Sequence, residues 1–427
     1  MGIFIDKGSK MMYSEIMKNG MISRDEYLNK LLAWKDKKVI KVVTGIRRCG
    51  KSTLFELYKD RLKECGVKDE RIVSVNFEDL AFESLTDYHA LYDHLIARLS
   101  EGETTYVFLD EVQKVDGFEK AVDSLFLNDN VDIYVTGSNS YLLSGELATY
   151  LTGRYVEIKM LPLGFGEFCE VSKGERDEMF AKYLTMGGFP YVASNAVDVV
   201  EIADAYLEGI YNTVIVKDIE ERQSRKASVD DKRNVSDLTL LKNIARFMAA
   251  NVGNYVSVKK IADYITSSGR KISQNTVAGY VDALVDAYVF YRAERFDLSG
   301  KQLLKNNSKY YIVDLGLRRH LIAKKEFDLG FLLENIVYFE LVRRGYSVWV
   351  GKLGTLEVDF VVQKSGVFEY FQVTASMTDK TTFDREMSPF GKIDDNFAKT
   401  VLTLDRFSQG NYGGIQVKNL VDWLLDK

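Results

Sequence analysis

The chain has 427 residues, of which 46% are hydrophobic and 12% are aromatic, and its formal net charge is -5. A chain of this length and apolar content can fill about three domain cores and is not a long disordered chain. The negative net charge excludes a protein coated with phosphate-binding charge. The cysteines, Cys49, Cys65 and Cys169, have no zinc-type spacing, and the chain contains neither a signal-peptide run nor a membrane-length apolar run. We therefore expect a cytoplasmic protein that makes no contact with a membrane.

The first part of the chain alternates short apolar strands with helices. The predicted elements span residues 21–36, 39–44, 51–63, 72–77, 106–109, 133–136 and 156–160, of which the first and third are helices. Buried strands that alternate with helices are typical of a parallel sheet covered on both faces. The pattern predicts an extension over residues 1–20 and an α/β domain over residues 21–160.

The alternation ends near Pro162, and three further segments follow. Residues 161–236 are predicted to form a helical lid and a charged linker, and residues 237–315 three helices followed by a hairpin. These elements span residues 240–250, 257–267, 273–287, 289–294 and 309–313. The last domain, residues 316–427, is predicted to be α/β, with elements at 331–343, 347–350, 356–362, 369–374, 400–404 and 420–425. The fold class is therefore α/β and multidomain.

A phosphate-binding motif lies between the first strand and the helix that follows it. The sequence Gly-Ile-Arg-Arg-Cys-Gly-Lys-Ser at residues 45–52 fits the P-loop pattern, in which glycines let the backbone wrap phosphates at a helix N-terminus. Lys51 is predicted to reach the β- and γ-phosphates of ATP, and Ser52 to bind Mg²⁺. The residues predicted to bind the nucleotide are Gly45, Arg47, Arg48, Cys49, Gly50, Lys51, Ser52 and Thr53.

Two carboxylates end the next long apolar strand and complete the predicted site. Asp110 is expected to hold Mg²⁺ through water, and Glu111 to polarise the attacking water. A later strand ends in small polar residues, of which Ser138 or Asn139 is predicted to lie beside the γ-phosphate. Arg154 is a candidate for neutralising transition-state charge in a neighbouring subunit of a homo-oligomer, and the alternative is a surface arginine that closes a turn. The site predicts hydrolysis of ATP to ADP and phosphate.

The order of motifs along the chain resembles that of a known family. After the paired arginines of the P-loop, the matching segments lie at residues 76–79, 109–113, 136–139, 161–168, 187–190 and 218–222. This order resembles prokaryotic AAA-type P-loop ATPases that carry an uncharacterised C-terminal domain of restriction-endonuclease-like fold. The resemblance covers nearly the whole chain. It implies nucleotide-binding roles for Gly50, Lys51, Ser52, Asp110 and Glu111.

The helices and hairpin within residues 237–315 resemble a winged helix. In DNA-binding versions of that fold the third helix enters the major groove, and Gln274, Asn275 and Thr276 have side chains suited to base edges there. The basic candidates for phosphate contact are Lys259, Lys260, Arg270, Lys271, Lys301 and Lys305. Asp282 and Asp286 follow on the same helix and favour the alternative, a module that packs against the ATPase. Duplex DNA is therefore one predicted partner, and another protein is the alternative.

Acidic residues in the last domain follow the order of a restriction-type nuclease site. Glu334 lies on a predicted helix, Asp359 on a strand that also bears Glu357, and Gln372 on the next strand. Gln372 stands where such sites have a carboxylate and Thr374 where they have a lysine, so charge to hold Mg²⁺ and a group to orient water are both missing. We expect a vestigial site, kept for packing or binding.

The sequence is compatible with three roles beyond ATP hydrolysis. The nucleotide state is expected to control the winged-helix and nuclease-like domains, either as a switch that acts on DNA or as a signalling switch that binds other proteins. The third role is an ATP-regulated nuclease.

Overall fold

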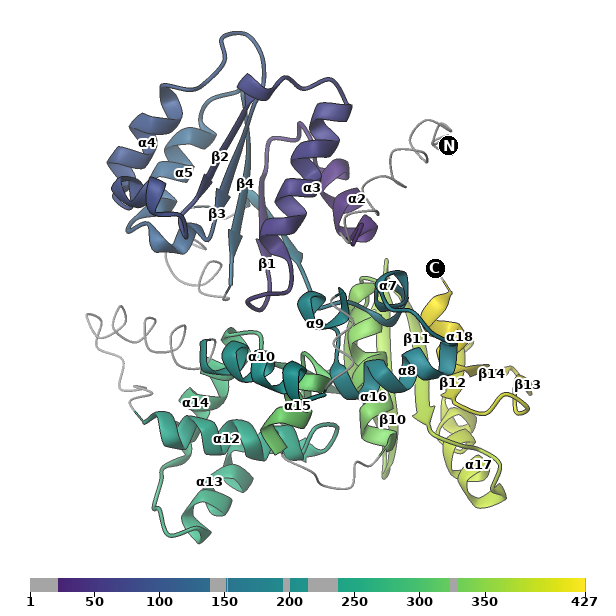
Figure 1. The fold of residues 1–427 in the computed structure, drawn as a ribbon. Helices are drawn as coiled ribbons and strands as arrows, with labels where there is room; N and C mark the ends of the chain where they lie inside the picture. The colour runs from purple at the N-terminus through teal and green to yellow at the C-terminus, as the bar shows by residue number, and fades with distance from the viewer. Residues whose placement is uncertain are drawn as a thin grey trace. The chain divides into compact units, whose positions relative to one another are not determined.

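A computed structural model describes residues 22–138, 151, 153–194, 200–213, 237–322 and 329–426. The chain forms two compact units, one of residues 1–162 with 286–288 and one of residues 163–285 with 289–427. Figure 1 traces both units along the chain. The predicted extension over residues 1–20 and the linker that ends at residue 236 lie outside the described residues. Among the helices of the described segments, none has both the length and the apolar character needed to cross a membrane.

The first unit is built on a parallel sheet. Within the described residues its strand order is β2-β3-β4-β1-β5, and all neighbouring strands run in the same direction. The strands are β1 (Ile40–Thr44), β2 (Ile72–Asn76), β3 (Thr105–Asp110), β4 (Val131–Gly137) and β5 (Tyr155–Lys159). The helices are α2 (Asp25–Ala33), α3 (Lys51–Glu64), α4 (Tyr88–Ile96) and α5 (Phe118–Phe126). The predicted strand positions are confirmed to within two residues at each end.

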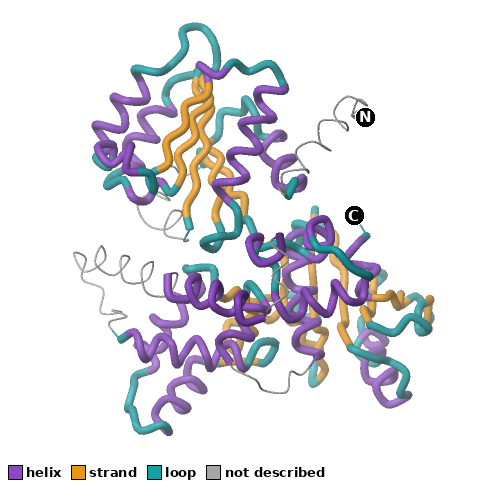
Figure 2. The backbone as a smooth tube through the Cα atoms, viewed as in Figure 1, coloured by secondary structure: helices purple, strands orange, loops and turns teal. Residues whose placement is uncertain are grey.

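Helices cover both faces of this sheet. Figure 2 shows its strands between the helices of the first unit, with α4 and α5 on one face and α2 and α3 on the other. On the α3 face, Tyr58 and Phe55 pack edge-on against Phe108, whose ring stacks on Tyr134 at 4.8 Å. Leu91 and Leu125 belong to the apolar core that includes the helices of the opposite face. The predicted parallel sheet with two covered faces is confirmed.

The second unit contains a larger mixed sheet. Within the described residues its strand order is β13-β14-β12-β11-β10-β9-β7-β8-β6. The strands are β6 (Tyr255–Val256), β7 (Phe290–Asp297), β8 (Gln302–Ile312), β9 (Ser347–Leu353), β10 (Leu356–Lys364), β11 (Val367–Thr374), β12 (Ala398–Thr403), β13 (Gly410–Tyr412) and β14 (Ile415–Asn419). The helices are α7 (Phe165–Val171), α8 (Arg176–Met186), α9 (Pro190–Ser194), α10 (Val200–Asn212), α12 (Leu238–Ala250), α13 (Val258–Ser267), α14 (Gln274–Asp286), α15 (Leu315–Ile322), α16 (Leu329–Arg343), α17 (Lys380–Met387) and α18 (Leu420–Leu425).

The hairpin of β7 and β8 belongs to the same sheet as the C-terminal strands. Its first strand pairs in parallel with β9, with Phe296 opposite Gly351. The predicted boundary between residues 315 and 316 therefore falls within one continuous sheet. The second strand of the hairpin is also longer than predicted, because Lys301 adopts a left-handed φ of 50° and reverses the chain so that Gln302 pairs with Asp297. The helices α12, α13 and α14 precede the hairpin as predicted, and their identity as a winged helix stays a prediction.

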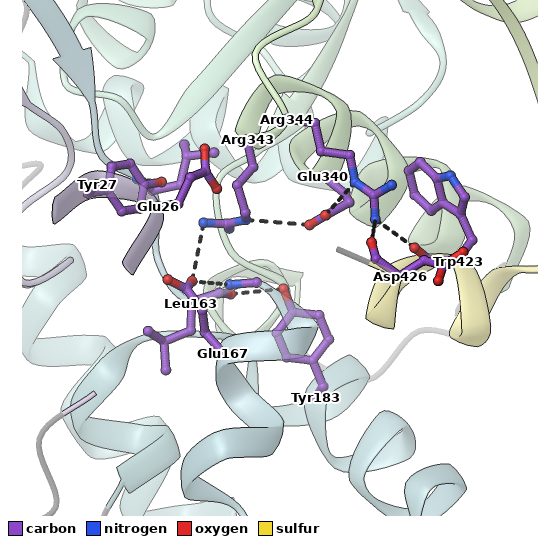
Figure 3. A network of polar contacts seen from close by, with 12 residues as sticks. Glu26, Tyr27, Leu163, Glu167, Tyr183, Glu340, Arg343, Arg344, Trp423 and Asp426 are labelled. Atoms are coloured by element: carbon purple, nitrogen blue, oxygen red, sulfur yellow. Dashed lines mark hydrogen bonds and ion pairs between the residues drawn. The ribbon is translucent and has the colours of Figure 1, made fainter. Parts of the chain in front are cut away.

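Arg343, the last residue of α16, and Arg344, which follows it, link this helix to two other helices of the second unit. Arg343 lies between Glu167 of α7 and Glu340 of its own helix, with nitrogen–oxygen distances of 3.3 and 3.5 Å (Figure 3). Arg344 binds Glu340 at 2.8 Å, donates to the Trp423 carbonyl of α18 at 2.6 Å, and lies 4.2 Å from the centre of the Trp423 ring. On α8, Tyr183 donates to the Leu163 carbonyl at 3.0 Å. These contacts join the helices beside the larger sheet.

Candidate functional site

The phosphate loop leaves β1 in a conformation that requires glycine at its two ends. A Cβ atom on Gly45 would lie 2.1 Å from the Met160 carbonyl oxygen, so any larger residue would force the backbone apart. Gly50 caps α3 with a φ of 103°, which side chains disfavour. Arg48 has a φ of 65° although it is not glycine, and such strain clusters at functional sites. The 14-residue helix α3 then begins at Lys51 and points its free N–H groups toward this loop.

Lys51 lies buried behind the loop, with 4% of its surface exposed. Its ammonium donates to the Gly45 carbonyl at 3.1 Å and lies 3.4 Å from Glu111 Oε1. Burial opposes the charged form, but the carboxylates of Glu111 and Asp110 outweigh burial and raise the pKa of Lys51. Burial also raises the pKa of the neighbouring Cys49 thiol, which therefore stays neutral. Lys51 is thus a fixed positive charge beside the phosphate loop.

Asp110 ends β3 and forms hydrogen bonds with two hydroxyl groups. Its carboxylate accepts from Thr136 Oγ1 and from the exposed Ser52 at the start of α3. Burial raises the pKa of Asp110, although both hydroxyls favour the ionised form. A carboxylate beside a hydroxyl at a phosphate-binding helix is the donor set that Mg²⁺ uses with a nucleotide. Ser52 and Asp110 therefore fit the metal role predicted for them.

The main-chain N–H and both carboxylate oxygens of Glu111 have polar partners. It adopts a φ of 54°, its N–H donates to Thr136 Oγ1 at 2.9 Å, and its Oε2 accepts from Gln113 Nε2 at 2.5 Å. Gln113 also lies 3.4 Å from Ser138 Oγ. Although burial favours the neutral acid, the Lys51 ammonium and the Gln113 amide lower the pKa of Glu111. Glu111 is therefore an ionised, oriented carboxylate beside the phosphate loop.

The structure brings most predicted residues together but leaves Arg154 apart. The Arg154 carbonyl accepts from the Ile40 N–H at 2.8 Å, at the start of β1, whereas the phosphate loop follows the end of that strand. Its guanidinium forms an ion pair with Asp123 and lies 5.9 Å from the Phe126 ring centre. Arg154 therefore lies at the N-terminal end of β1, whereas the P-loop of the same chain follows the C-terminal end of that strand. Asn139 lies outside the described residues.

Sequence reasoning missed the roles of Gln113 and Thr136. Both lie inside segments that the motif order had singled out, at residues 109–113 and 136–139. The contacts of Thr136 with Asp110 and Glu111 depend on the pairing of β3 with β4, whereas Gln113 lies only two residues from Glu111. That pairing is not visible in local periodicity, so the segments could be found but not the contacts.

The proposed DNA-reading residues lie exposed at the start of α14. Gln274, Asn275 and Thr276 are all exposed, and the Ser273 hydroxyl accepts from the Thr276 N–H at 3.1 Å. Arg270, a predicted phosphate contact, forms an ion pair with Asp237 instead. The surface therefore offers polar side chains at a helix N-terminus with part of its positive charge neutralised.

The three residues of the predicted vestigial site also lie close together. The Asp359 N–H donates to Gln372 Oε1 at 3.1 Å, and the charge of Glu334 contributes to the raised pKa of Asp359. Because the Gln372 carbonyl oxygen faces the backbone of β10, it is already engaged by a donor. A lysine that the predicted site lacked, Lys309 of β8, lies 2.8 Å from Glu334.

Comparison with known proteins relates these features to a family. An AAA domain model matches residues 37–169, and a model described as a domain of unknown function (DUF8612) matches residues 177–328. An uncharacterized protein of Haemophilus influenzae is 40% identical over 415 residues, which cover 96% of this chain and 100% of that protein. The two proteins belong to one AAA-domain family. An uncharacterized protein of Methanocaldococcus jannaschii is 30% identical over 377 residues, which cover 83% of this chain and 78% of that protein.

In this chain the AAA match includes the phosphate loop, Asp110, Glu111 and β4. The first unit is therefore an AAA-type P-loop ATPase domain. Among solved structures, a Walker-type ATPase of Pyrococcus abyssi aligns with a TM-score of 0.47 and 16% identity, covering 70% of this chain and 96% of that one. The Orc1 protein of Aeropyrum pernix, solved in complex with DNA, aligns with a TM-score of 0.32 and 14% identity, covering 70% of this chain and 92% of that one.

Proposed function

We propose that this protein is a Mg²⁺-dependent ATPase that works as a molecular switch, converting ATP and water to ADP and phosphate. The main support is the position of the Lys51 ammonium, which lies 3.1 Å from a loop carbonyl and 3.4 Å from the Glu111 carboxylate. A γ-phosphate bound in the loop would compete with Glu111 for this ammonium. ATP binding would thus release one oxygen of Glu111 at the moment when a base is needed.

The surrounding residues have distinct proposed roles in this reaction. The N–H groups at the start of α3 and the side chains of Arg47 and Arg48 bind the phosphates. Ser52 and Asp110 would hold Mg²⁺, which when bound neutralises charge on the phosphate oxygens. Glu111 then orients and polarises the attacking water.

Two neighbours of Glu111 keep it oriented after Lys51 has moved. Thr136 accepts from the Glu111 N–H, and Gln113 donates to Glu111 Oε2, so neither contact requires Lys51. Ser138, which is 1% exposed, supports Gln113 from the end of β4. We propose that Gln113 is a positioning residue and that Glu111 is the catalytic carboxylate.

Steady-state ATP hydrolysis with Mg²⁺ tests this proposal. Glu111→Gln keeps the shape of the side chain but removes the charge, and it should reduce turnover to the level of a blank. Glu101→Gln makes the same chemical change at an exposed residue of the same unit and should leave turnover unchanged. Equal turnover in the wild type and in Glu111→Gln would reject the assignment of Glu111.

We propose that the second unit provides the output of the switch and that duplex DNA is its partner. The support is the exposed start of α14, where Gln274, Asn275 and Thr276 lie at the N-terminus of a 13-residue helix. Such side chains reach base edges in helix-based DNA recognition, and helix N-termini bind phosphates. A switch that binds another protein is the alternative, because the ion pairs of Arg270 with Asp237 and of Arg292 with Asp282 reduce the positive charge nearby.

Hydrolysis measured with and without duplex DNA separates these two outputs. A DNA partner predicts stimulation that weakens as salt rises, because phosphate contacts release counterions. Gln274→Ala with Asn275→Ala should remove the stimulation and keep the basal rate, whereas Gln416→Ala on the exposed part of β14 should keep both. Turnover that does not respond to DNA at low salt would favour the protein-binding switch.

A further inference from the structure

A buried ammonium lies among carboxylates in the second unit. Lys309 of β8 places Nζ 2.8 Å from Glu334 Oε1 of α16 and 2.7 Å from Glu357 Oε1 of β10. Lys309 is 4% exposed and Glu334 is 6% exposed, so their charges are largely removed from water. Tyr311 OH donates to the same Glu334 oxygen at 2.5 Å. Buried charges persist in proteins when they are paired and hydrogen-bonded in this way.

We call Glu334, Glu357, Asp359 and Gln372 the acidic centre. Its other two members, Asp359 and Gln372, accept hydrogen bonds from backbone N–H groups. The Val373 N–H donates to Asp359 Oδ2 at 2.8 Å, and the Asp359 N–H donates to Gln372 Oε1 at 3.1 Å. One carboxylate oxygen of Asp359 and the amide oxygen of Gln372 are therefore already engaged by backbone donors.

We infer that Lys309 is the resident cation of this acidic centre and that its ammonium takes the place of a divalent metal ion between Glu334 and Glu357. The second unit thus keeps the acidic order of a nuclease while its own lysine neutralises it. Among the residues that the structure describes, no group of three or more His, Cys, Asp or Glu side chains is placed to hold a metal ion. This inference does not depend on the ATPase reaction.

The same contact explains how three segments are held together. Lys309 comes from β8, Glu334 from α16 and Glu357 from β10, so the ammonium joins elements that are distant in sequence. Removal of the lysine would leave Glu334 and Glu357 facing each other without a counter-charge. Glu334 is buried and the Glu357 side chain is 36% exposed, so the two like charges at short range should destabilise the fold unless a cation replaces the ammonium.

Lys309→Met in the full chain tests the inference, because methionine keeps the apolar stem without the charge. Thermal unfolding without nucleotide is followed in EDTA and during titration with Mn²⁺. The wild-type Tm should not change with Mn²⁺. The variant should lose roughly 10 °C in EDTA, the shift expected for a broken buried ion pair, and recover part of it in Mn²⁺. A parallel series in Asp110→Asn proteins separates any Mn²⁺ effect at the nucleotide site.

The double variant Lys309→Met with Glu334→Gln provides a second test of the inference. With one negative charge removed, it should unfold at a higher temperature than Lys309→Met in EDTA and should no longer respond to Mn²⁺. If Lys309→Met does not fold, a folded double variant supports the inference, and a double variant that also fails to fold overturns it. A folded Lys309→Met that is indifferent to Mn²⁺ overturns it too, as does DNA cleavage by the wild type that Asp359→Asn abolishes.

Discussion

Replacement of Gln113 by leucine should separate the positioning of Glu111 from nucleotide binding. The variant removes the 2.5 Å hydrogen bond to Glu111 Oε2 and keeps most of the side-chain volume. A hydrogen bond to a charged group contributes about 1.5–3 kcal/mol, so kcat should fall by roughly 10- to 100-fold. The KM for ATP should change little, because Gln113 contacts the carboxylate and not the phosphate loop. Steady-state hydrolysis over a range of ATP concentrations measures both constants.

The pH dependence of kcat gives a second, independent readout of the same change. The Gln113 amide helps to lower the pKa of Glu111, against burial, so its loss should raise that pKa. Because Glu111 acts as a carboxylate, activity is lost as the pH falls through its pKa, and the acid limb should therefore move to higher pH in the variant. Gln416→Leu makes the same substitution at an exposed site and should change neither quantity. An unchanged kcat, or a raised KM with an unchanged kcat, would refute a positioning role.

Three further substitutions test separate parts of the first unit. Gly45→Ala should abolish ATP binding, measured by isothermal titration, because its Cβ would lie 2.1 Å from the Met160 carbonyl oxygen. Lys41→Met should cost about 3–5 kcal/mol in urea unfolding, because it leaves Asp132 buried without its ion-pair partner, and adding Asp132→Asn should recover much of that loss. Arg154→Ala should leave hydrolysis nearly unchanged, because the arginine lies at the start of β1 and the P-loop of its own chain follows the end of that strand. A loss of activity that mixing with Lys51→Ala subunits restores would instead demonstrate a site shared within a homo-oligomer.

Residues that share one local motif could be placed from the sequence. Lys51 and Ser52 open the helix directly after the phosphate loop, and Asp110 and Glu111 end an apolar strand. Parallel strands bring their carboxyl ends to one edge of the sheet, so the order of these motifs was enough to predict that they meet. The P-loop pattern is local, and its flanking strand and helix fix its geometry.

Contacts between distant segments could not be predicted in the same way. Sequence reasoning placed Lys309 in a strand of the hairpin and gave it no role, yet its ammonium binds Glu334, 25 residues later, and also Glu357. Which residues meet there depends on the pairing of β7 with β9, and strand pairing is not encoded in local periodicity. The position of Arg154 escaped prediction for the same reason, because it follows from the pairing of β5 with β1.

The fate of labelled ATP on three proteins tests the central claim most directly. Each protein is mixed with Mg²⁺ and a substoichiometric amount of ATP labelled at the γ-phosphate, and bound ATP and released phosphate are measured in the same sample. The proposed site predicts phosphate release by the wild type, intact bound ATP on Glu111→Gln, and almost no bound nucleotide on Lys51→Ala, because the ammonium binds phosphate whereas the carboxylate acts on water. Phosphate release by Glu111→Gln at the wild-type rate, or full ATP binding by Lys51→Ala, would contradict it.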